Sequence, residues 1–444
     1  MVARVSVKWS QDMRNSFLTS FIALLCVFTT TSYAQADWVT PSERVLEGIS
    51  LRDGPSSQSG YLGQLKVGER LEYLSSVPHW HKVRLANGQS AFISKSWSSI
   101  VPGTAPPDTS GFFTIDVVDV GTGLAVLIQG QDFAMLYDGG SNDDLAIGAG
   151  NRLMAFLAAA YPSLTRIDHV ILSHPHRDHV ELLPDVMTNF EIGDVWDSGA
   201  VNDICGYRAF IDAVVEKNLT YHTARRNHGS HAVKFPKDTG SCYGTPRAAR
   251  NVTVNHGSQI DEQPIILGEN ASMQFLYASG NKHSSFNENS SVVRIDLGDY
   301  RVLLMGDAEA GSRENWSNVK PKNSSIEGML LACCSTQLRS NILIAGHHGS
   351  RTSSRKGFLD AVQASTYVIS SGPKKYGSVI LPDQIVVSEL NSRGSVFRTD
   401  RDDEACTSDI NKIGSDADDS AGGCDNIRIK LGNGISADYL DISD

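Results

Sequence analysis

Residues 169–179 have the sequence His-Val-Ile-Leu-Ser-His-Pro-His-Arg-Asp-His, and this stretch decides the fold of the main domain. Its first five residues form a mostly apolar run, as in a buried strand. Three imidazoles and a carboxylate follow within six residues, from His174, His176, Asp178 and His179. In a core each would need a hydrogen-bond partner away from water. Imidazole and carboxylate suit zinc, manganese or iron, so the stretch predicts a metal site at a strand end.

Two later strand ends carry residues of the same kind. Residues 302–305 form an apolar run that leads through a glycine to Asp307, and residues 341–345 form another that leads to His347 and His348. Each motif alone is weak evidence, because glycine and aspartate also mark ordinary turns. In this order after the first cluster, the motifs together indicate one site in which the aspartate can bridge two cations.

The motifs resemble those of the metallo-β-lactamase fold, and within it the hydrolase domain of the competence protein ComEC. The resemblance covers about residues 112–400 and includes Asp119-Val-Gly-x-Gly, Asp138-Gly-Gly and Asn289-Ser290. It implies an α/β fold, namely an αββα sandwich. It also implies two divalent metal ions, zinc or manganese, at the upper edge of the sheets.

The metal ligands follow from the same resemblance. His174 and His176 would hold the first metal. Asp178, His179 and one of the two adjacent histidines would hold the second, with an aspartate between the metals. The expected ligand set is His174, His176, Asp178, His179, Asp307 and His347. The expected catalytic residues are Asp178 and Asp307 as proton acceptors and His348 as proton donor. Water and Lys375 are alternative proton donors.

Three stretches of the sequence depart from the family pattern. Thr122 and Leu124 replace the usual Gln and Asp of the first motif. Residues 287–290 lack the additional histidine that many lactamases place on the first metal, and residues 374–377 lack the histidine of a late family element. The first metal site is therefore expected to have fewer ligands.

The expected substrate follows from charge. The formal net charge of −11 argues against a protein whose overall charge attracts nucleic acid. Residues 225–250 nevertheless contain six basic residues and one acidic residue. Because a guanidinium contacts two phosphate oxygens at once, Arg225 and Arg226 are expected to bind a small phosphodiester or a short nucleic acid. A solvated basic loop is the alternative explanation.

Together these features predict a metal-dependent phosphodiesterase or nuclease. Two bound metals would supply a metal-bound hydroxide at neutral pH, so no serine or cysteine nucleophile is needed. Two alternatives stay open. One is a lactamase- or lactonase-type hydrolase on the same fold, and the other is a non-catalytic cell-wall-binding protein.

Export is predicted from the N-terminus. A basic stretch ends at Arg14, an apolar run follows over residues 17–28, and Ser32-Tyr33-Ala34 offers a cleavage site. Residues 1–34 therefore predict a signal peptide and a periplasmic or secreted protein. No stable membrane insertion is expected after cleavage, and an uncleaved anchor is the alternative.

The cysteines agree with export. Six of them follow the signal peptide, and an even number in an exported chain favours disulfides. Sequence proximity pairs Cys205 with Cys242 and Cys406 with Cys424. The adjacent cysteines at 333–334 follow an apolar run, and buried thiols explain them at least as well.

A small β module precedes the main domain. Residues 41–101 contain short β-type runs between turns and resemble a bacterial SH3 domain, with Leu51-Arg-Asp-Gly-Pro and Trp80-His-Lys-Val as matching elements. The resemblance implies a small barrel that binds cell-wall peptides or packs against its own enzyme. Trp80 would then line a groove or belong to the core. Residues 102–110 predict a linker, and residues 111–444 the hydrolase domain.

Overall fold

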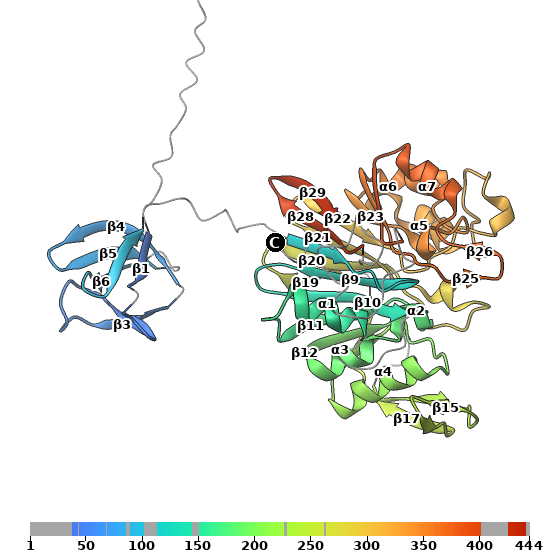
Figure 1. Ribbon diagram of the computed structural model, residues 1–444, viewed down its shortest axis with the longest axis horizontal. Helices are drawn as coiled ribbons and strands as arrows, with labels where there is room; N and C mark the ends of the chain where they lie inside the picture. Colours follow the sequence, from blue (N-terminus) through green and yellow to red (C-terminus); the bar gives the residue numbers. More distant parts are fainter. Residues whose placement is uncertain are drawn as a thin grey trace, which may run out of the picture. The chain divides into compact units, whose positions relative to one another are not determined.

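The chain divides into two compact units, residues 1–108 and 109–444, shown in the computed structural model of Figure 1. The residues that the structure describes are 38–42, 44–67, 69–85, 89–101, 113–143, 151–225, 229–261, 263–400 and 425–440. The predicted signal peptide, the predicted linker, Arg226 and the predicted Cys406–Cys424 pair lie outside these residues. Within them, no helix is long and apolar enough to cross a membrane.

The first unit is an antiparallel sheet with the strand order β3-β2-β6-β5-β4-β1-β7, which confirms the SH3-like prediction. Its strands are β1 (Trp38–Pro41), β2 (Gly48–Arg52), β3 (Tyr61–Lys66), β4 (Leu71–Val77), β5 (Trp80–Arg84), β6 (Ser90–Ser94) and β7 (Ser98–Val101). Alternate residues such as Ile49, Val83 and Ile93 fill the core. Trp80 is half-buried and, with Trp97, lines a cavity of about 730 Å³, so it lies at a surface hollow.

The second unit contains two large sheets. The first has the order β18-β13-β12-β11-β10-β9-β8-β28-β29 and the second has the order β19-β20-β21-β22-β23-β24-β27. The strands of the first sheet are β8 (Phe113–Val117), β9 (Gly123–Gln129), β10 (Ala134–Ser141), β11 (Arg166–Leu172), β12 (Glu191–Asp197), β13 (Thr220–Thr223), β18 (Ser258–Gln259), β28 (Ile427–Gly432) and β29 (Gly434–Tyr439). Those of the second are β19 (Ile265–Gly268), β20 (Ala271–Tyr277), β21 (Val292–Leu297), β22 (Tyr300–Leu304), β23 (Ile342–Ile344), β24 (Thr366–Ile369) and β27 (Ser395–Arg398).

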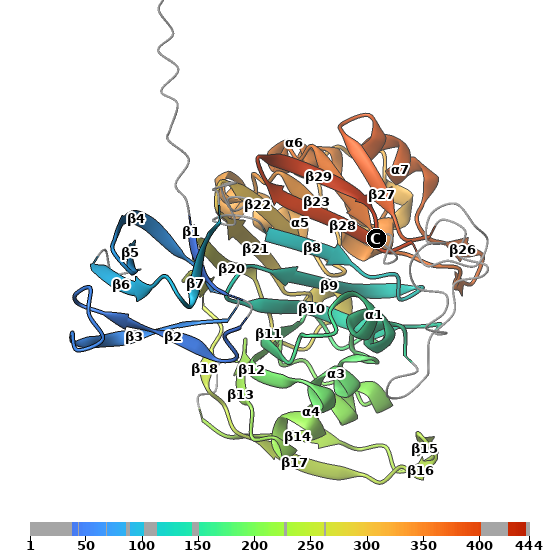
Figure 2. The same cartoon turned by 60° about the vertical axis from the view of Figure 1, so that its left-hand side comes forward.

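Helices cover the outer face of each sheet, as Figure 2 shows. The helices beside the first sheet are α1 (Arg152–Ala160), α2 (Arg177–Val180), α3 (Leu183–Asn189) and α4 (Cys205–Glu216). Those beside the second are α5 (Ile326–Cys334), α6 (Lys356–Val362) and α7 (Gln384–Asn391). Short 3₁₀ turns are η3 (Phe286–Asn289), η4 (Arg313–Asn315), η5 (Ser335–Gln337) and η6 (Gly346–Gly349). The predicted αββα sandwich is confirmed.

Side-chain alternation explains why the layers stack in this way. In β9, Leu124, Val126 and Ile128 point into the core between the two sheets. The residues between them, Ala125 and Leu127, belong to the core beneath the helices. A strand that is apolar on both faces must be covered on both faces, which favours a four-layer fold.

Three small hairpins extend from this framework. They are β14 (His231–Phe235) with β17 (Arg250–Val254), β15 (Ser241–Cys242) with β16 (Thr245–Pro246), and β25 (Lys375–Tyr376) with β26 (Val379–Ile380). The first two come from the predicted basic segment, and β17 packs against α4.

The described cysteines form two disulfides. Cys205 is bonded to Cys242, as predicted, and this bond joins the start of α4 to the β15–β16 hairpin. The adjacent Cys333 and Cys334 are bonded to each other. The sequence left a disulfide and buried thiols open for this pair, and the structure has the disulfide, with Cys333 exposed near the end of α5.

Candidate metal centre

Parallel pairing brings the three motifs to one edge of the sandwich. β10 and β11 are parallel in the first sheet, and β22, β23 and β24 are parallel in the second. Because carboxyl ends of parallel strands meet at one edge, the residues after β11, β22 and β23 become neighbours. The loop after β11 supplies the first histidine cluster, while the other two strands lead to Asp307 and to the η6 turn.

The Asp138-Gly-Gly motif fixes the histidine loop. The carboxylate of Asp138 accepts hydrogen bonds from the Ser173 backbone N–H at 2.6 Å and from the Ser173 hydroxyl at 2.7 Å. Gly140 lies directly against the first turn of the ligand loop, so a Cβ atom there would lie 2.3 Å from the His179 backbone nitrogen. Only glycine permits this close approach.

Two groups of candidate ligands converge at this edge. The first group is His174, His176 and Asp307, and the second group is Asp178, His179 and His348. Within each group the ligand atoms all lie within 4.8 Å of one another. In the first group, His174 Nε2 lies 2.9 Å from His176 Nδ1 and 3.6 Å from Asp307 Oδ2.

Asp307 also borders the second group. Its Oδ1 atom lies 3.1 Å from His179 Nε2 and 3.5 Å from His348 Nε2. Across the group, His348 Nε2 lies 3.6 Å from the Oδ2 atom of Asp178. With one carboxylate oxygen facing each group, Asp307 is placed as the predicted bridging carboxylate.

Unpaired buried atoms test whether metal ions fit here. Among the described residues, His179 Nε2, His348 Nε2 and Asp307 Oδ1 are buried without a hydrogen-bond partner, and all three face one point. Buried polar atoms without a partner are rare and costly. Two imidazole nitrogens and a carboxylate oxygen that face the same point match the donor atoms that bind a zinc or manganese ion. The residues therefore fit a pair of divalent cations.

The protonation states of His179 and Asp307 follow from their burial and from the charged groups beside them. Burial disfavours the charged form of His179, but the carboxylates of Asp307 and Asp138 outweigh it and raise its pKa well above the usual value. Burial opposes ionisation of Asp307, yet His179 and His348 hold the pKa of this carboxyl well below its usual range. Cation binding would therefore release a proton from His179, because a ligating imidazole must be neutral.

The structure distinguishes the two adjacent histidines, between which the sequence left the metal-ligand role open. The expectation placed His347 on the second metal, but the structure brings His348 into the second group. Both residues have left-handed backbone, with φ of 51°, and this conformation points their rings in different directions. His348 Nδ1 donates to the Ser370 carbonyl oxygen at 2.9 Å, which leaves Nε2 facing the centre. His347 Nδ1 instead lies 2.7 Å from the hydroxyl of Thr352.

A cavity of about 510 Å³ opens above the ligands, and we call it the metal cavity. Its lining includes His176, Asp178, Asp307, His347 and Tyr376, together with two arginines, Arg177 and Arg313. Arg225, the predicted substrate residue, does not line it. The side-chain stem of Arg225 packs instead against Gly199 and Gly280.

Sequence patterns do not reveal two residues that contact a candidate ligand. Asn142 Nδ2 donates to Asp178 Oδ2 at 2.7 Å, and the Tyr376 hydroxyl donates to the same oxygen at 2.9 Å. The two side chains also contact each other at 2.8 Å. Tyr376 belongs to the shortened late element at 374–377, which is its one signal in the sequence, and no sequence motif points to Asn142. His283, by contrast, bonds to the Ser279 hydroxyl and belongs to neither group.

We expect Tyr376→Phe to weaken binding of the second metal by roughly 10–100-fold, because outer partners orient ligating carboxylates. Competition with a chromogenic zinc chelator would measure this. Tyr300→Phe is the matched control, since that hydroxyl bonds to the Gly432 carbonyl in the β-sandwich away from the ligands. Equal zinc affinity in Tyr376→Phe and wild type would contradict the assigned orienting role.

Two family models match the chain. Residues 47–99 match the bacterial SH3 domain, and residues 118–258 match the metallo-beta-lactamase superfamily. The second match contains the Asp138-Gly-Gly motif and the histidine cluster. It ends before Asp307 and the η6 turn.

Two characterised proteins show distant homology to the chain. The competence protein ComA of Neisseria gonorrhoeae is 30% identical over 184 residues, which are 41% of this chain and 23% of that protein. Recombination protein 2 of Haemophilus influenzae is 25% identical over 258 residues, which are 58% of this chain and 24% of that protein. The matched regions thus span about a quarter of these relatives.

Two solved structures resemble the chain at low identity and with TM-scores below 0.5. The metallo-beta-lactamase fold protein YhfI from Bacillus subtilis is 15% identical with a TM-score of 0.33, and the match covers 65% of this chain and 97% of YhfI. The metallo hydrolase Igni18 from Ignicoccus hospitalis is 11% identical with a TM-score of 0.35, and the match covers 65% of this chain and 95% of Igni18.

Proposed function

Since the chain consists of a bacterial SH3 domain followed by a metallo-β-lactamase domain, we propose that it is an exported two-metal phosphodiesterase that acts on short nucleic acids. The proposal combines the candidate metal centre with the arginines of the metal cavity. Export rests on the signal-like sequence at residues 1–34.

The observation that carries the proposal is the pair of arginines above the ligands. Arg313 is held by Asp383 at 2.5 Å and by the Ser350 hydroxyl at 3.1 Å. Arg177 lies 3.6 Å from Glu181 and keeps more than a third of its side chain exposed. A phosphodiester stays anionic throughout hydrolysis, so these two guanidiniums, of which Arg313 is held by close contacts, favour it over a neutral lactam.

When bound, two divalent cations would activate a water molecule and stabilise charge on the phosphoryl group. The side chains around the cations would orient the substrate, position the ligands and donate a proton. Arg177 and Arg313 would orient the diester, while Asn142 and Tyr376 hold the Asp178 carboxylate in place. His347 lines the cavity, and its Nε2 atom lies 3.3 Å from Asn287 Nδ2 and 3.8 Å from Asp307 Oδ2, so this imidazole borders the centre. We propose that it gives a proton to the leaving oxygen.

The names of the relatives support the choice of substrate. One is named for competence and the other for recombination, and recombination is a process of nucleic acids. The net charge of −11 disfavours tight binding of long polyanions, which is why short substrates are proposed.

Removing the metals should abolish phosphodiester hydrolysis. We expect protein dialysed against EDTA to cleave bis(p-nitrophenyl) phosphate no faster than buffer, and added zinc or manganese to restore the rate. Measurement of metal per chain before and after dialysis would show that the treatment worked. Full activity in protein shown to be metal-free would contradict the proposed mechanism.

The same metal-loaded protein separates the alternatives. Cleavage of a chromogenic cephalosporin or a lactone without cleavage of any phosphodiester would favour the lactamase- or lactonase-type reading. Failure to bind metal at all would favour a non-catalytic protein.

We also propose that the SH3 domain binds cell-wall peptides. Its cavity of about 730 Å³ is lined by Trp80 and Trp97 and by charged residues of both signs, Arg44 and Glu47 among them. Aromatic rings beside paired charges suit a peptide that carries both an amine and a carboxylate. Sedimentation with purified peptidoglycan, compared between wild type and Trp80→Ala, would test this.

A further inference from the structure

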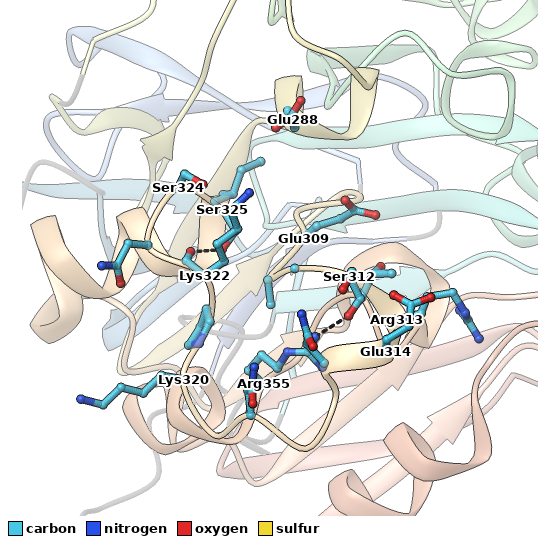
Figure 3. A pocket seen from close by; sticks show the side chains of 18 residues that line it. Glu288, Glu309, Ser312, Arg313, Glu314, Lys320, Lys322, Ser324, Ser325 and Arg355 are labelled. Carbon is cyan, nitrogen blue, oxygen red and sulfur yellow. Dashed lines mark hydrogen bonds between the residues drawn. The ribbon is translucent and has the colours of Figure 1, made fainter.

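A second cavity lies beside the metal cavity, and we call it the side cavity. It has a volume of about 840 Å³ and is formed by η4, the segment that follows it and the start of α5 (Figure 3). Arg313 and Thr352 line both cavities, so the two share a wall. Three of the six candidate ligands, His176, Asp178 and Asp307, line the metal cavity, so the side cavity adjoins the centre through that shared wall.

The acidic residues of the side cavity are largely engaged by neighbours. Glu309 Oε1 faces His347 Nδ1 at 3.1 Å and accepts from Asn287 at 3.4 Å. The carboxylate of Glu288 accepts from the Ser284 hydroxyl at 2.9 Å and from backbone N–H groups beside it. The carboxylates of Glu288 and Glu309 are therefore not available to bind a cationic ligand, whereas Glu314, the third acidic residue of the lining, is exposed.

Two lysines of the side cavity are not engaged in this way. Lys320 and Lys322 are exposed, and across the described residues no carboxylate lies within ion-pair distance of either ammonium group. Figure 3 shows Lys320 extending outward from the rim, while the Arg355 guanidinium is turned toward the Ser312 carbonyl oxygen. The lining thus offers two free cations to an anionic ligand that leaves the metal cavity along this side.

We propose that the side cavity is a second phosphate subsite, in which Lys320 and Lys322 contact the phosphate adjacent to the scissile one in a single-stranded oligonucleotide. This inference rests on the proposed function and adds the direction in which the strand leaves the centre. Hydroxyl and amide groups that line the same cavity can bond to the sugar and base between the two phosphates. These groups belong to Ser324, Ser325, Asn315, Asn318 and Asn323.

Direct binding tests the subsite without catalysis. The double variant Lys320→Ala/Lys322→Ala should bind a short fluorescein-labelled single-stranded DNA more weakly, in fluorescence anisotropy with the full chain in EDTA. Each phosphate contact to a single strand contributes about 0.7 to the slope of log affinity against log salt. Because both lysines contact the same phosphate, the double variant should have a slope that is shallower by about 0.7.

A matched control is Lys234→Ala/Lys430→Ala, which removes two exposed lysines from β14 and β28 and keeps the net charge equal to that of the test variant. Its slope should equal that of wild type. Equal slopes in wild type and in the Lys320→Ala/Lys322→Ala variant would overturn the subsite, and so would equal losses in the test and control variants.

Kinetics with two substrates separates the subsite from the proposed function. With metal bound, kcat/KM for the oligonucleotide should fall in the test variant, while kcat/KM for bis(p-nitrophenyl) phosphate should not change, because that diester has no second phosphate. Equal losses on both substrates would overturn the subsite and leave the phosphodiesterase standing. Absence of hydrolysis of both substrates by wild type would instead overturn the proposed function, with the subsite still decided by the binding slopes.

Discussion

Asp307→Ala should yield a folded protein that retains neither metal and has no measurable hydrolase activity. One oxygen of this carboxylate faces His174 at 3.6 Å and the other faces His179 at 3.1 Å, so the substitution removes a ligand from both groups. Loss of an outer partner already costs roughly 10–100-fold in metal affinity, and loss of a shared direct ligand should cost more. Metal per chain by mass spectrometry, with circular dichroism to verify folding, would measure the effect.

Asp296→Ala is the matched control for this variant. Asp296 lies in β21 of the same sheet and forms ion pairs with Arg294 and Arg301, away from the ligands. It should keep both metals and wild-type activity. Two tightly bound metals in Asp307→Ala would show that the aspartate does not bridge them.

Asp138→Asn should produce the second largest loss of metal affinity, because it changes the tautomer of the candidate ligand His179. The carboxylate of Asp138 lies 2.8 Å from His179 Nδ1 and, as an acceptor, keeps the proton on that nitrogen. An asparagine amide turned toward the ring would donate instead, which moves the proton to Nε2 and blocks the ligating lone pair. We expect metal affinity to fall by about 10–100-fold. Zinc competition would measure it.

A buried carboxylate elsewhere in the sheet controls for the general cost of this change. Asp197 ends β12, is fully buried, and accepts hydrogen bonds from the Tyr207 and Tyr221 hydroxyls at 2.8 and 2.6 Å. Asp197→Asn should lose a similar amount of stability, on the order of 1–3 kcal/mol, and keep its metals. Equal metal affinity in both variants would contradict the tautomer argument.

The sequence was sufficient for the sandwich and for most of the ligands because both depend on local order. An apolar run that is followed at once by ligating side chains predicts a strand that ends at the edge of a sheet, as residues 169–179 do. The choice between His347 and His348 depends on two left-handed residues in succession, which composition does not reveal. Asn142 and Tyr376 meet Asp178 only through the fold, since 234 residues separate them from each other.

Charge counting also does not show which basic side chains reach the metal cavity. Residues 225–250 are strongly basic, but net charge says nothing about where a side chain is directed. Arg250 pairs with Asp212 on α4, and Arg208 of the same helix bonds to the Lys237 carbonyl oxygen. Part of the basic segment therefore serves to hold its hairpin against α4, while the arginines above the ligands come from separate loops.

The η6 turn places thermal stability and activity in opposition. Left-handed backbone costs a residue other than glycine on the order of 1–3 kcal/mol, and this turn contains two such residues in succession. Selection for heat resistance alone would favour glycine at both positions, and the need for imidazoles opposes it. A more thermostable variant of this protein would therefore have to gain its extra stability elsewhere, for example in the surface loops of the two helical layers.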